Sequence, residues 1–285
     1  MSVILKDGGH SHSTHHVTAT SLSLAYGHRR VVENVDLAVP DHQIGSIIGP
    51  NGSGKSTVLK ALSRLMTPER GTVTLDGRSI NTMPTREVAQ KLGLLPQSAN
   101  APEGITIAEL VMRGRYPYHR FGQRWDKADE RALSHALEAT GLSDISDRPV
   151  DGVSGGQRQR AWIALALAQE TDVMLLDEPT TFLDIAYQFE VLDLLSDLNA
   201  QEGVTIVMVL HDLNLAARYS DWMLAMHDGR RAAFGTPNEV ITEQLMHAVF
   251  GLHATVELAK GTNTPVVFPS PQHSLRARRS DITTS

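Results

Sequence analysis

The sequence contains no cysteine. This absence excludes a disulfide framework, thiolate catalysis and a zinc site with sulfur ligands, and it fits the cytosol. Long apolar runs are also missing, because none approaches the ~18 to 20 residues that a membrane-spanning helix requires. The first twenty residues have no apolar core behind basic residues, so they do not resemble a secretory signal. We therefore expect a soluble chain.

Basic residues are fewer than acidic ones. The chain has 26 Lys and Arg against 32 Asp and Glu, a net charge of −6 at pH 7. A domain that binds nucleic acid is normally basic, so we expect no nucleic-acid partner. With 285 residues, of which 41% are hydrophobic, the chain can bury a full core in one large domain or two small ones.

A complete phosphate-binding loop is present. Its residues are Gly49, Pro50, Asn51, Gly52, Ser53, Gly54, Lys55, Ser56 and Thr57. An apolar strand-like run at 43–48 precedes the loop, and apolar residues follow at helical spacing, namely Val58, Leu59, Leu62, Leu65 and Met66. Glycines let backbone N–H groups turn toward phosphate oxygens, and a helix N-terminus favours anions. Lys55 can reach the β and γ phosphates and Ser56 can ligate Mg²⁺, so the pattern predicts a nucleotide site.

Two adjacent carboxylates end a second apolar strand at 172–178. In a parallel sheet the carboxyl ends of the strands face the ligand crevice, so Asp177 would lie beside the phosphate loop and could hold Mg²⁺. Glu178, one residue further on, could polarise a water for attack on the γ-phosphorus. An isolated Asp-Glu pair at the end of a strand is often simply exposed to solvent, which is the alternative interpretation here. The phosphate loop in the same chain favours the functional interpretation.

A third element opens another helix, since an apolar helical run at 161–168 follows Ser154, Gly155, Gly156 and Gln157. Ser154 is a natural cap, and the glycines make a second anion-binding helix start. This element, 23 residues ahead of Asp177, resembles the signature of ABC-type ATPases. Val153 departs from the leucine more common in the family, and Thr181-Phe182 departs from the common Ser-Ala.

Four further positions match motifs of that family. Gln97 matches the glutamine loop, and Asp184 matches the loop that crosses the dimer interface. His211 matches the switch histidine, and Tyr26 matches the aromatic residue that stacks on adenine. Taken alone, His211 is more often structural and Tyr26 could be a core aromatic, because neither spacing nor periodicity identifies them.

The resemblance implies an α/β fold with a RecA-like P-loop NTPase core. It also implies an N-terminal antiparallel β subdomain and an inserted helical subdomain at about 98–160, in which residues 126–142 read as a helix. The resemblance covers residues 17–252. We expect residues 1–16 to be a flexible His-rich tail and 253–285 a flexible C-terminal extension, with few large apolar residues beyond Val266, Val267 and Phe268.

The two ends have alternative interpretations. The histidines of the N-terminal tail could bind a transition metal, although a disordered tail is favoured; they are His10, His12, His15 and His16. The C-terminal arginines at 276–279 could touch anionic lipid, but a solvated tail is favoured there too.

The family resemblance also implies a mechanism. It assigns catalysis to Glu178, His211 and Gln97, and Mg²⁺ to Ser56, Gln97 and Asp177. In the family, Ser154 and Gly156 of one subunit complete the ATP site that Lys55 of another subunit binds. Hydrolysis then requires a head-to-tail homodimer.

The segment Arg113–Trp125 concentrates four aromatic residues and four arginines in thirteen positions. Such residues are enriched where partners dock, and here the resemblance implies a membrane permease. An exposed loop with some buried aromatic side chains is the alternative interpretation.

The short sequences around the motifs suggest a subfamily. Arg-Tyr-Pro-Tyr and Thr-Thr-Phe-Leu-Asp resemble the importer ATPases for iron–siderophore, haem and cobalamin uptake, of which siderophores are favoured. Such a protein would lie on the cytoplasmic face of the inner membrane and meet a periplasmic or lipoprotein binding protein only indirectly. Two alternatives are a soluble ABC protein of translation or DNA repair, which generally has two cassettes or a long coiled coil, and a non-hydrolysing regulator, which would tolerate loss of Glu178 or His211.

Overall fold

The computed structural model describes residues 16–97, 100–119 and 124–270. The interpretations of His10, His12, His15 and the arginines at 276–279 therefore lie outside the described residues. Within the described ranges, no helix is both long and apolar enough to cross a membrane.

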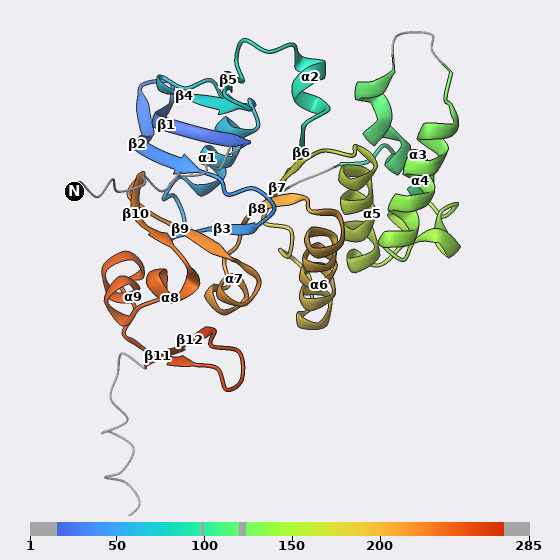
Figure 1. Ribbon diagram of the computed structural model, residues 1–285. Coiled ribbons are helices and arrows are strands. Elements are labelled where there is room, and N and C mark those ends of the chain that lie inside the picture. The colour runs from blue at the N-terminus through green and yellow to red at the C-terminus, as the bar shows by residue number, and fades with distance from the viewer. Residues whose placement is uncertain (1–15, 98–99, 120–123, 271–285) are drawn as a thin grey trace, which may run out of the picture.

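The N-terminal part forms a four-stranded antiparallel sheet in the order β2-β1-β4-β5. Its strands are β1 (Val17–Tyr26), β2 (Arg29–Ala38), β4 (Arg70–Leu75) and β5 (Arg78–Ser79). A two-residue turn joins β1 to β2, and Gly27 there takes the left-handed φ of +58° that such turns require. This sheet forms the upper left of Figure 1.

The central sheet has six strands in the order β10-β9-β3-β8-β7-β6. The strands are β3 (Ile44–Ile48), β6 (Leu92–Leu95), β7 (Val173–Asp177), β8 (Thr205–Val209), β9 (Trp222–His227) and β10 (Arg230–Gly235). All pairs are parallel except the antiparallel edge pair β9–β10. Both faces of the parallel strands are covered, and this is why β7 and β8 are continuous buried runs rather than alternating ones.

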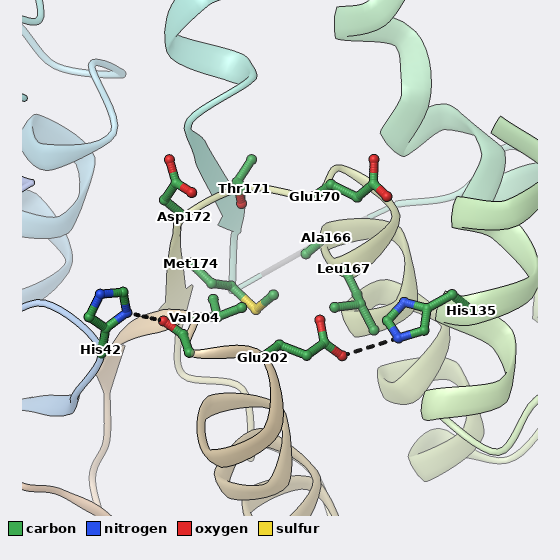
Figure 2. A pocket seen from close by; sticks show the side chains of 11 residues that line it. His42, His135, Ala166, Leu167, Glu170, Thr171, Asp172, Met174, Glu202 and Val204 are labelled. Carbon is green, nitrogen blue, oxygen red and sulfur yellow. Dashed lines mark hydrogen bonds and ion pairs between the residues drawn. The ribbon is translucent and has the colours of Figure 1, made fainter. Parts of the chain in front are cut away.

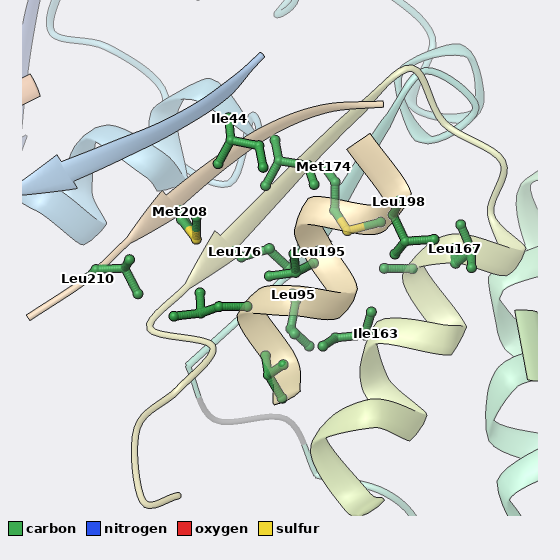
Figure 3. Close-up of a cluster of buried hydrophobic side chains, with 14 of the residues drawn as sticks. Ile44, Leu95, Ile163, Leu167, Met174, Leu176, Leu195, Leu198, Met208 and Leu210 are labelled. Carbon is green, nitrogen blue, oxygen red and sulfur yellow. The ribbon is translucent and has the colours of Figure 1, made fainter. Parts of the chain in front are cut away.

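Successive residues of the central strands supply two different cores. Met174 and Leu176 of β7 point toward helices α5 (Gly155–Ala168) and α6 (Ile185–Glu202), where they join Leu195 and Ile163 (Figure 3). Leu175 of the same strand faces the other way, toward the first helix and the antiparallel sheet. The first helix is therefore held between two sheets, and this packing fixes the loop that precedes it.

Twelve helical segments complete the described part of the chain. The α-helices are α1 (Lys55–Leu62), α2 (Thr85–Ala89), α3 (Ile107–Met112), α4 (Lys127–Ala139), α5 (Gly155–Ala168), α6 (Ile185–Glu202), α7 (Leu213–Tyr219), α8 (Pro237–Val240) and α9 (Glu243–Phe250), and the 3₁₀ segments are η1 (Arg113–Tyr118), η2 (Ser143–Ile145) and η3 (Val150–Gly152). Helices α3, α4 and α5 pack together at one side of the core (Figure 1). Asp126 caps α4 within the stretch predicted to be helical, whereas α5 continues beyond residue 160.

Helix α1 is shorter than the apolar spacing predicted. It ends at Leu62, and Arg64 then takes a left-handed φ of +62°. Leu65 is consequently exposed, so it does not extend the apolar face of the helix.

The expectation of a flexible extension from residue 253 is wrong for its first part. Strands β11 (Ala254–Leu258) and β12 (Pro265–Pro269) form an antiparallel hairpin that packs on α7. The backbone N–H of Val267 donates to Oδ1 of Asn214 over 2.8 Å, and the Val267 side chain is buried in the core. Burial of Pro265 and Val267, together with cross-strand pairing, thus orders a segment that we expected to be flexible.

Candidate nucleotide site

The phosphate-binding loop connects the carboxyl end of β3 to the start of α1. Gly49 and Gly54 have φ values of +148° and +100°, which side chains rarely allow. A Cβ at Gly49 would lie 2.2 Å from the carbonyl oxygen of Met226, so β9 closes directly over the loop. The backbone turn that the glycines predicted is therefore required on steric as well as conformational grounds.

The start of α1 is open to an anion. The first-turn N–H groups of a helix have no intrahelical acceptor, and no side chain at Gly54 caps them here. The Oγ of Ser53 is buried in the loop without a hydrogen-bond partner among the described residues. Unpaired donors at a helix start are what a bound phosphate satisfies, so the loop fits ATP.

Lys55 lies folded over its own loop. Its Nζ donates to the carbonyl oxygens of Gly49 and Pro50, at 2.9 and 3.1 Å. Burial lowers the pKa of Lys55, and the negative charges of Glu178 and Asp177 oppose this change. The ammonium is thus already held beside the place where phosphates would lie.

Asp177 and Ser56 form an oxygen pair beside the loop. Ser56 Oγ donates to Asp177 Oδ1 over 2.8 Å, and Asp177 is buried at the end of β7. Burial raises the pKa of Asp177, the bond from Ser56 lowers it, and the charge of Glu178 raises it again, with a net increase. A hydroxyl and a carboxylate side by side are the hard oxygen ligands that Mg²⁺ prefers, so these residues fit that ion.

Three side-chain donors contact the carboxylate of Glu178. His211 Nε2 lies 2.6 Å from its Oε1, and Gln97 Nε2 and Thr181 Oγ1 donate to its Oε2 over 2.6 and 3.0 Å. Burial acts to raise the pKa of Glu178, but these hydrogen bonds outweigh burial and lower it. The backbone of Glu178 has a left-handed φ of +56°, uncommon for a residue with a side chain, and this conformation turns the carboxylate out of the strand direction.

One cavity of about 300 Å³ brings these elements together. It is lined by Val31, Asn51, Gly52, Gly54, Lys55, Ser56, Thr57, Glu178 and His211. Gln97 reaches it through its bond to Glu178. Tyr26 is 51% exposed at the end of β1, in the hairpin whose second strand supplies Val31.

The signature residues and Asp184 lie apart from this cavity in the single subunit. Ser154 caps α5 in a reciprocal arrangement with Gln157, at 3.2 and 3.1 Å. Asp184 precedes α6 and does not use its side chain to cap that helix. Ser154, Gly155 and Asp184 are exposed. One subunit therefore presents two separate groups of predicted site residues.

The sequence motifs do not identify two residues of the site. Thr181 donates to Glu178, and its position three residues later in the turn is the only signal that could have identified it. Val31 lines the cavity from β2, and its apolar character carries no sign of that position.

Comparison with known proteins agrees with this geometry. The family model described as ABC transporter matches residues 32–181. The chain belongs to the ABC transporter family. The Probable siderophore transport system ATP-binding protein YusV of Bacillus subtilis (strain 168) is 51% identical over 89% of this chain and 92% of the relative. The ferric enterobactin transport ATP-binding protein FepC of Escherichia coli (strain K12) is 50% identical over 87% of this chain and 92% of the relative.

Solved ABC structures share the architecture. An inward-facing ABC transporter assigned to the metal-chelate type is 25% identical with a TM-score of 0.78, over 90% of this chain and 98% of the other. The dimeric post-hydrolysis state of the cassette MJ0796, bound to ADP and Pi, is 29% identical with a TM-score of 0.67, over 77% and 98%. The predicted P-loop core with an antiparallel β subdomain is confirmed, and ATP binding follows from membership of the ABC family.

The segment predicted to meet a permease is only partly exposed. Tyr116 is 60% exposed, and its ring centroid lies 6.5 Å from that of Trp125. Both line a second cavity of about 460 Å³, with Glu103, Gly104, Ile105, Glu109, Met112 and Arg113. Arg115 is instead 3% exposed and paired with Asp129, so it belongs to the interior of the protein. Residues 120–123 of the segment lie outside the described part.

A third cavity, of about 270 Å³, lies at the opposite edge of the parallel sheet, where β7 and β8 begin (Figure 2). Both of its histidines have partners within it. His135 Nε2 is 3.3 Å from Glu202 Oε1, and His42 Nδ1 is 2.6 Å from the carbonyl oxygen of Gly203. This cavity is separate from the nucleotide site.

Proposed function

We propose that this chain is the ATP-hydrolysing subunit of a bacterial importer for ferric siderophores. The observation that carries the proposal is the single cavity in which Lys55, Ser56, Glu178 and His211 converge. The cargo rests on the relatives at 51% and 50% identity, whose names specify siderophore and ferric enterobactin transport.

The predicted residues in and around the cavity would have distinct roles in hydrolysis. The loop N–H groups and Lys55 bind the phosphates, and Tyr26 stacks on adenine. Glu178 accepts a proton from the attacking water, and its lowered pKa keeps it ionised at neutral pH. His211 and Gln97, which both bond to Glu178, orient this carboxylate.

Magnesium would be held by Ser56, Asp177 and Gln97. The ion supplies positive charge for the phosphate oxygens. The protein contributes the oxygen pair of Ser56 and Asp177, already 2.8 Å apart. Gln97, at the carboxyl end of β6, adds an amide oxygen.

Hydrolysis would require a head-to-tail homodimer. Ser154, Gly155, Gly156 and Gln157 of one subunit would complete the nucleotide site of the other, with Asp184 at the interface. Exposure of Ser154, Gly155 and Asp184 in the single subunit supports this arrangement. The dimeric structure of the MJ0796 cassette supports it as well.

A membrane permease would dock on the cavity of Tyr116 and Trp125. Two exposed aromatic rings, with Arg113 and two glutamates at the same cavity, form the mixed surface typical of interface centres. The chain would then lie on the cytoplasmic face of the inner membrane, and a periplasmic or lipoprotein binding protein would act on it only through the permease.

Uptake of radioactive iron bound to a panel of siderophores tests the proposal. Cells that lack the protein are complemented with the parent, with Glu178→Gln, or with Glu130→Gln, an exposed glutamate on α4, as the matched control. We expect the parent and Glu130→Gln to restore uptake and Glu178→Gln to fail. Normal uptake of every siderophore without the protein would contradict the cargo, and rescue by Glu178→Gln would contradict the need for hydrolysis.

A further inference from the structure

The start of α6 touches the start of α5, and these helices pack side by side (Figure 1). A Cβ built on Gly156 would lie 2.7 Å from Cδ1 and 3.0 Å from Cγ of Tyr187. Real Cβ atoms do not approach ring carbons that closely, so the ring edge of Tyr187 rests directly on the Gly156 backbone. Gly156 is buried and Tyr187 is half-buried.

The backbone of Gly156 does not itself require glycine. Its φ is not in the left-handed region, unlike that of the phosphate-loop glycines. A Cβ on its neighbour Gly155 would meet only Leu183, at an ordinary 3.8 Å. Within the subunit, the Tyr187 ring is therefore what excludes a side chain at Gly156.

Tyr187 belongs to a segment that hydrogen bonds tie back to Glu178. The Thr181 backbone N–H donates to the carbonyl oxygen of Glu178 over 3.2 Å, in addition to its side-chain bond. Further along, Gln188 Nε2 donates to the carbonyl oxygen of Leu183 over 2.9 Å, where α6 begins. These bonds order the turn that follows Glu178 and the start of α6, the helix that carries Tyr187.

We propose that Tyr187 is a positioning residue, which sets the signature loop of its own subunit and so acts on the nucleotide bound by the partner. The inference rests on the proposed function, because the signature serves the partner only in a head-to-tail dimer. Ser154 and Gln157 already bond to each other through the Ser154 N–H and the Gln157 N–H, so the Ser154 hydroxyl and the N–H groups of Gly155 and Gly156 are the donors left to meet phosphate. A misplacement of about 1 Å at such donors costs on the order of a hundredfold in rate.

The test compares Tyr187→Ala and Tyr187→Phe in the full chain carrying Glu178→Gln, so that ATP is not consumed. Phenylalanine keeps the ring carbons that approach Gly156, and alanine removes them. Calorimetry at low protein concentration gives the ATP affinity of the monomer, and sedimentation with ATP gives the dimer dissociation constant. Hydrogen exchange without nucleotide follows the Gln157 and Arg158 amides, which bond to Ser154.

For Tyr187→Ala we expect monomer ATP affinity within about twofold of the parent, because the ring lies outside the nucleotide cavity. We expect the dimer to weaken by about tenfold or more and the Gln157 and Arg158 amides to exchange about tenfold faster, since the helix start loses its support. Tyr187→Phe should restore both.

A dimer dissociation constant for Tyr187→Ala that matches the parent overturns the proposal. A weakened dimer with unchanged exchange also overturns it, because Tyr187 would then touch the partner directly. If the Glu178→Gln chain itself does not dimerise with ATP, the head-to-tail dimer of the proposed function is wrong, and the role of Tyr187 toward the partner falls with it.

Discussion

Replacing Arg115 by methionine should destabilise the protein because it strands a buried carboxylate. Arg115 Nε donates to Asp129 Oδ1 over 3.1 Å, and Nη1 donates to Glu170 Oε2 and the carbonyl oxygen of Ala168, at 2.5 and 3.0 Å. Burial lowers the pKa of Arg115, but the bonds to the two carboxylates outweigh it and raise the pKa, so the side chain stays charged. These bonds tie η1 to α4 and to the end of α5.

The structure bounds the size of the effect. Removing one partner of a buried ion pair costs about 3–5 kcal/mol. The Glu170 side chain is 56% exposed and can regain water. Asp129 still accepts from the Asp126 N–H over 2.9 Å, and His119 Nε2 lies 2.8 Å from its Oδ2. We therefore expect a loss near the lower end, about 3 kcal/mol.

Urea unfolding followed by circular dichroism measures the loss. With a slope of about 2–3 kcal/mol per molar for a chain of this size, the midpoint should fall by about 1 to 1.5 M. Arg113→Met, two residues away and half-buried, is the matched control and should change stability by about 0.5 kcal/mol or less. Adding Asp129→Asn to Arg115→Met should recover about 1–2 kcal/mol, because the stranded charge is gone. A midpoint for Arg115→Met equal to that of Arg113→Met would refute the reasoning.

Three other predictions concern the nucleotide site, and a fourth concerns the dimer interface. Glu178→Gln should bind ATP like the parent but hydrolyse it about 10²–10⁴ times more slowly. Steady-state kinetics measures the rate, and hydrolysis at the parent rate would contradict the prediction. Lys55→Ala should weaken ATP binding by about 10–100-fold, since a charged hydrogen bond contributes about 1.5–3 kcal/mol, and calorimetric titration checks this. Because the pKa of Asp177 is raised, this carboxylate takes up a proton at a higher pH than an ordinary aspartate does. Titrations of the ATP-bound protein with Mg²⁺ should therefore show the Mg²⁺ affinity falling at a higher pH than an ordinary aspartate would give. A fall in affinity only at the pH expected for an ordinary aspartate would contradict the prediction. Phe182 is 96% exposed beside Asp184. Phe182→Ser should weaken ATP-dependent dimerisation as measured by sedimentation, and an unchanged dimer dissociation constant would contradict this expectation.

Local motifs are the part of this protein that a sequence can predict. The phosphate loop is contiguous, and its glycines, Lys55 and Ser56 lie in the structure as their spacing requires. The acid pair was placed at a strand end by the apolar run before it, and β7 ends at Asp177. In both cases the residues that determine the local structure lie within a few positions of the motif that predicts it.

Contacts between distant segments could not be predicted in the same way. Gln97 and Glu178 are 81 residues apart, and only the folded sheet brings β6 beside β7. The burial of Arg115 depends on Asp129 from another helix, although composition placed this arginine in an exposed interface. The hairpin at 254–269 was missed because its apolar run, β12, is short and its order depends on pairing with β11 and on contact with α7, which lies far away in the sequence.

The bonding of Glu178 links the strength of the base to the rest of the fold. An ionised carboxylate has about four lone-pair sites, and three donors already occupy Glu178, which leaves about one for a water. Each donor stabilises the ionised form, so each also makes Glu178 a weaker proton acceptor. Gln97 lies two residues after β6, on the segment that leads to the helices at 107–139. A shift of those helices that withdrew Gln97 would free a second lone-pair site and raise the pKa of Glu178. If Glu178 is the base that we propose, the position of the helical subdomain would then control both the room for water and its activation.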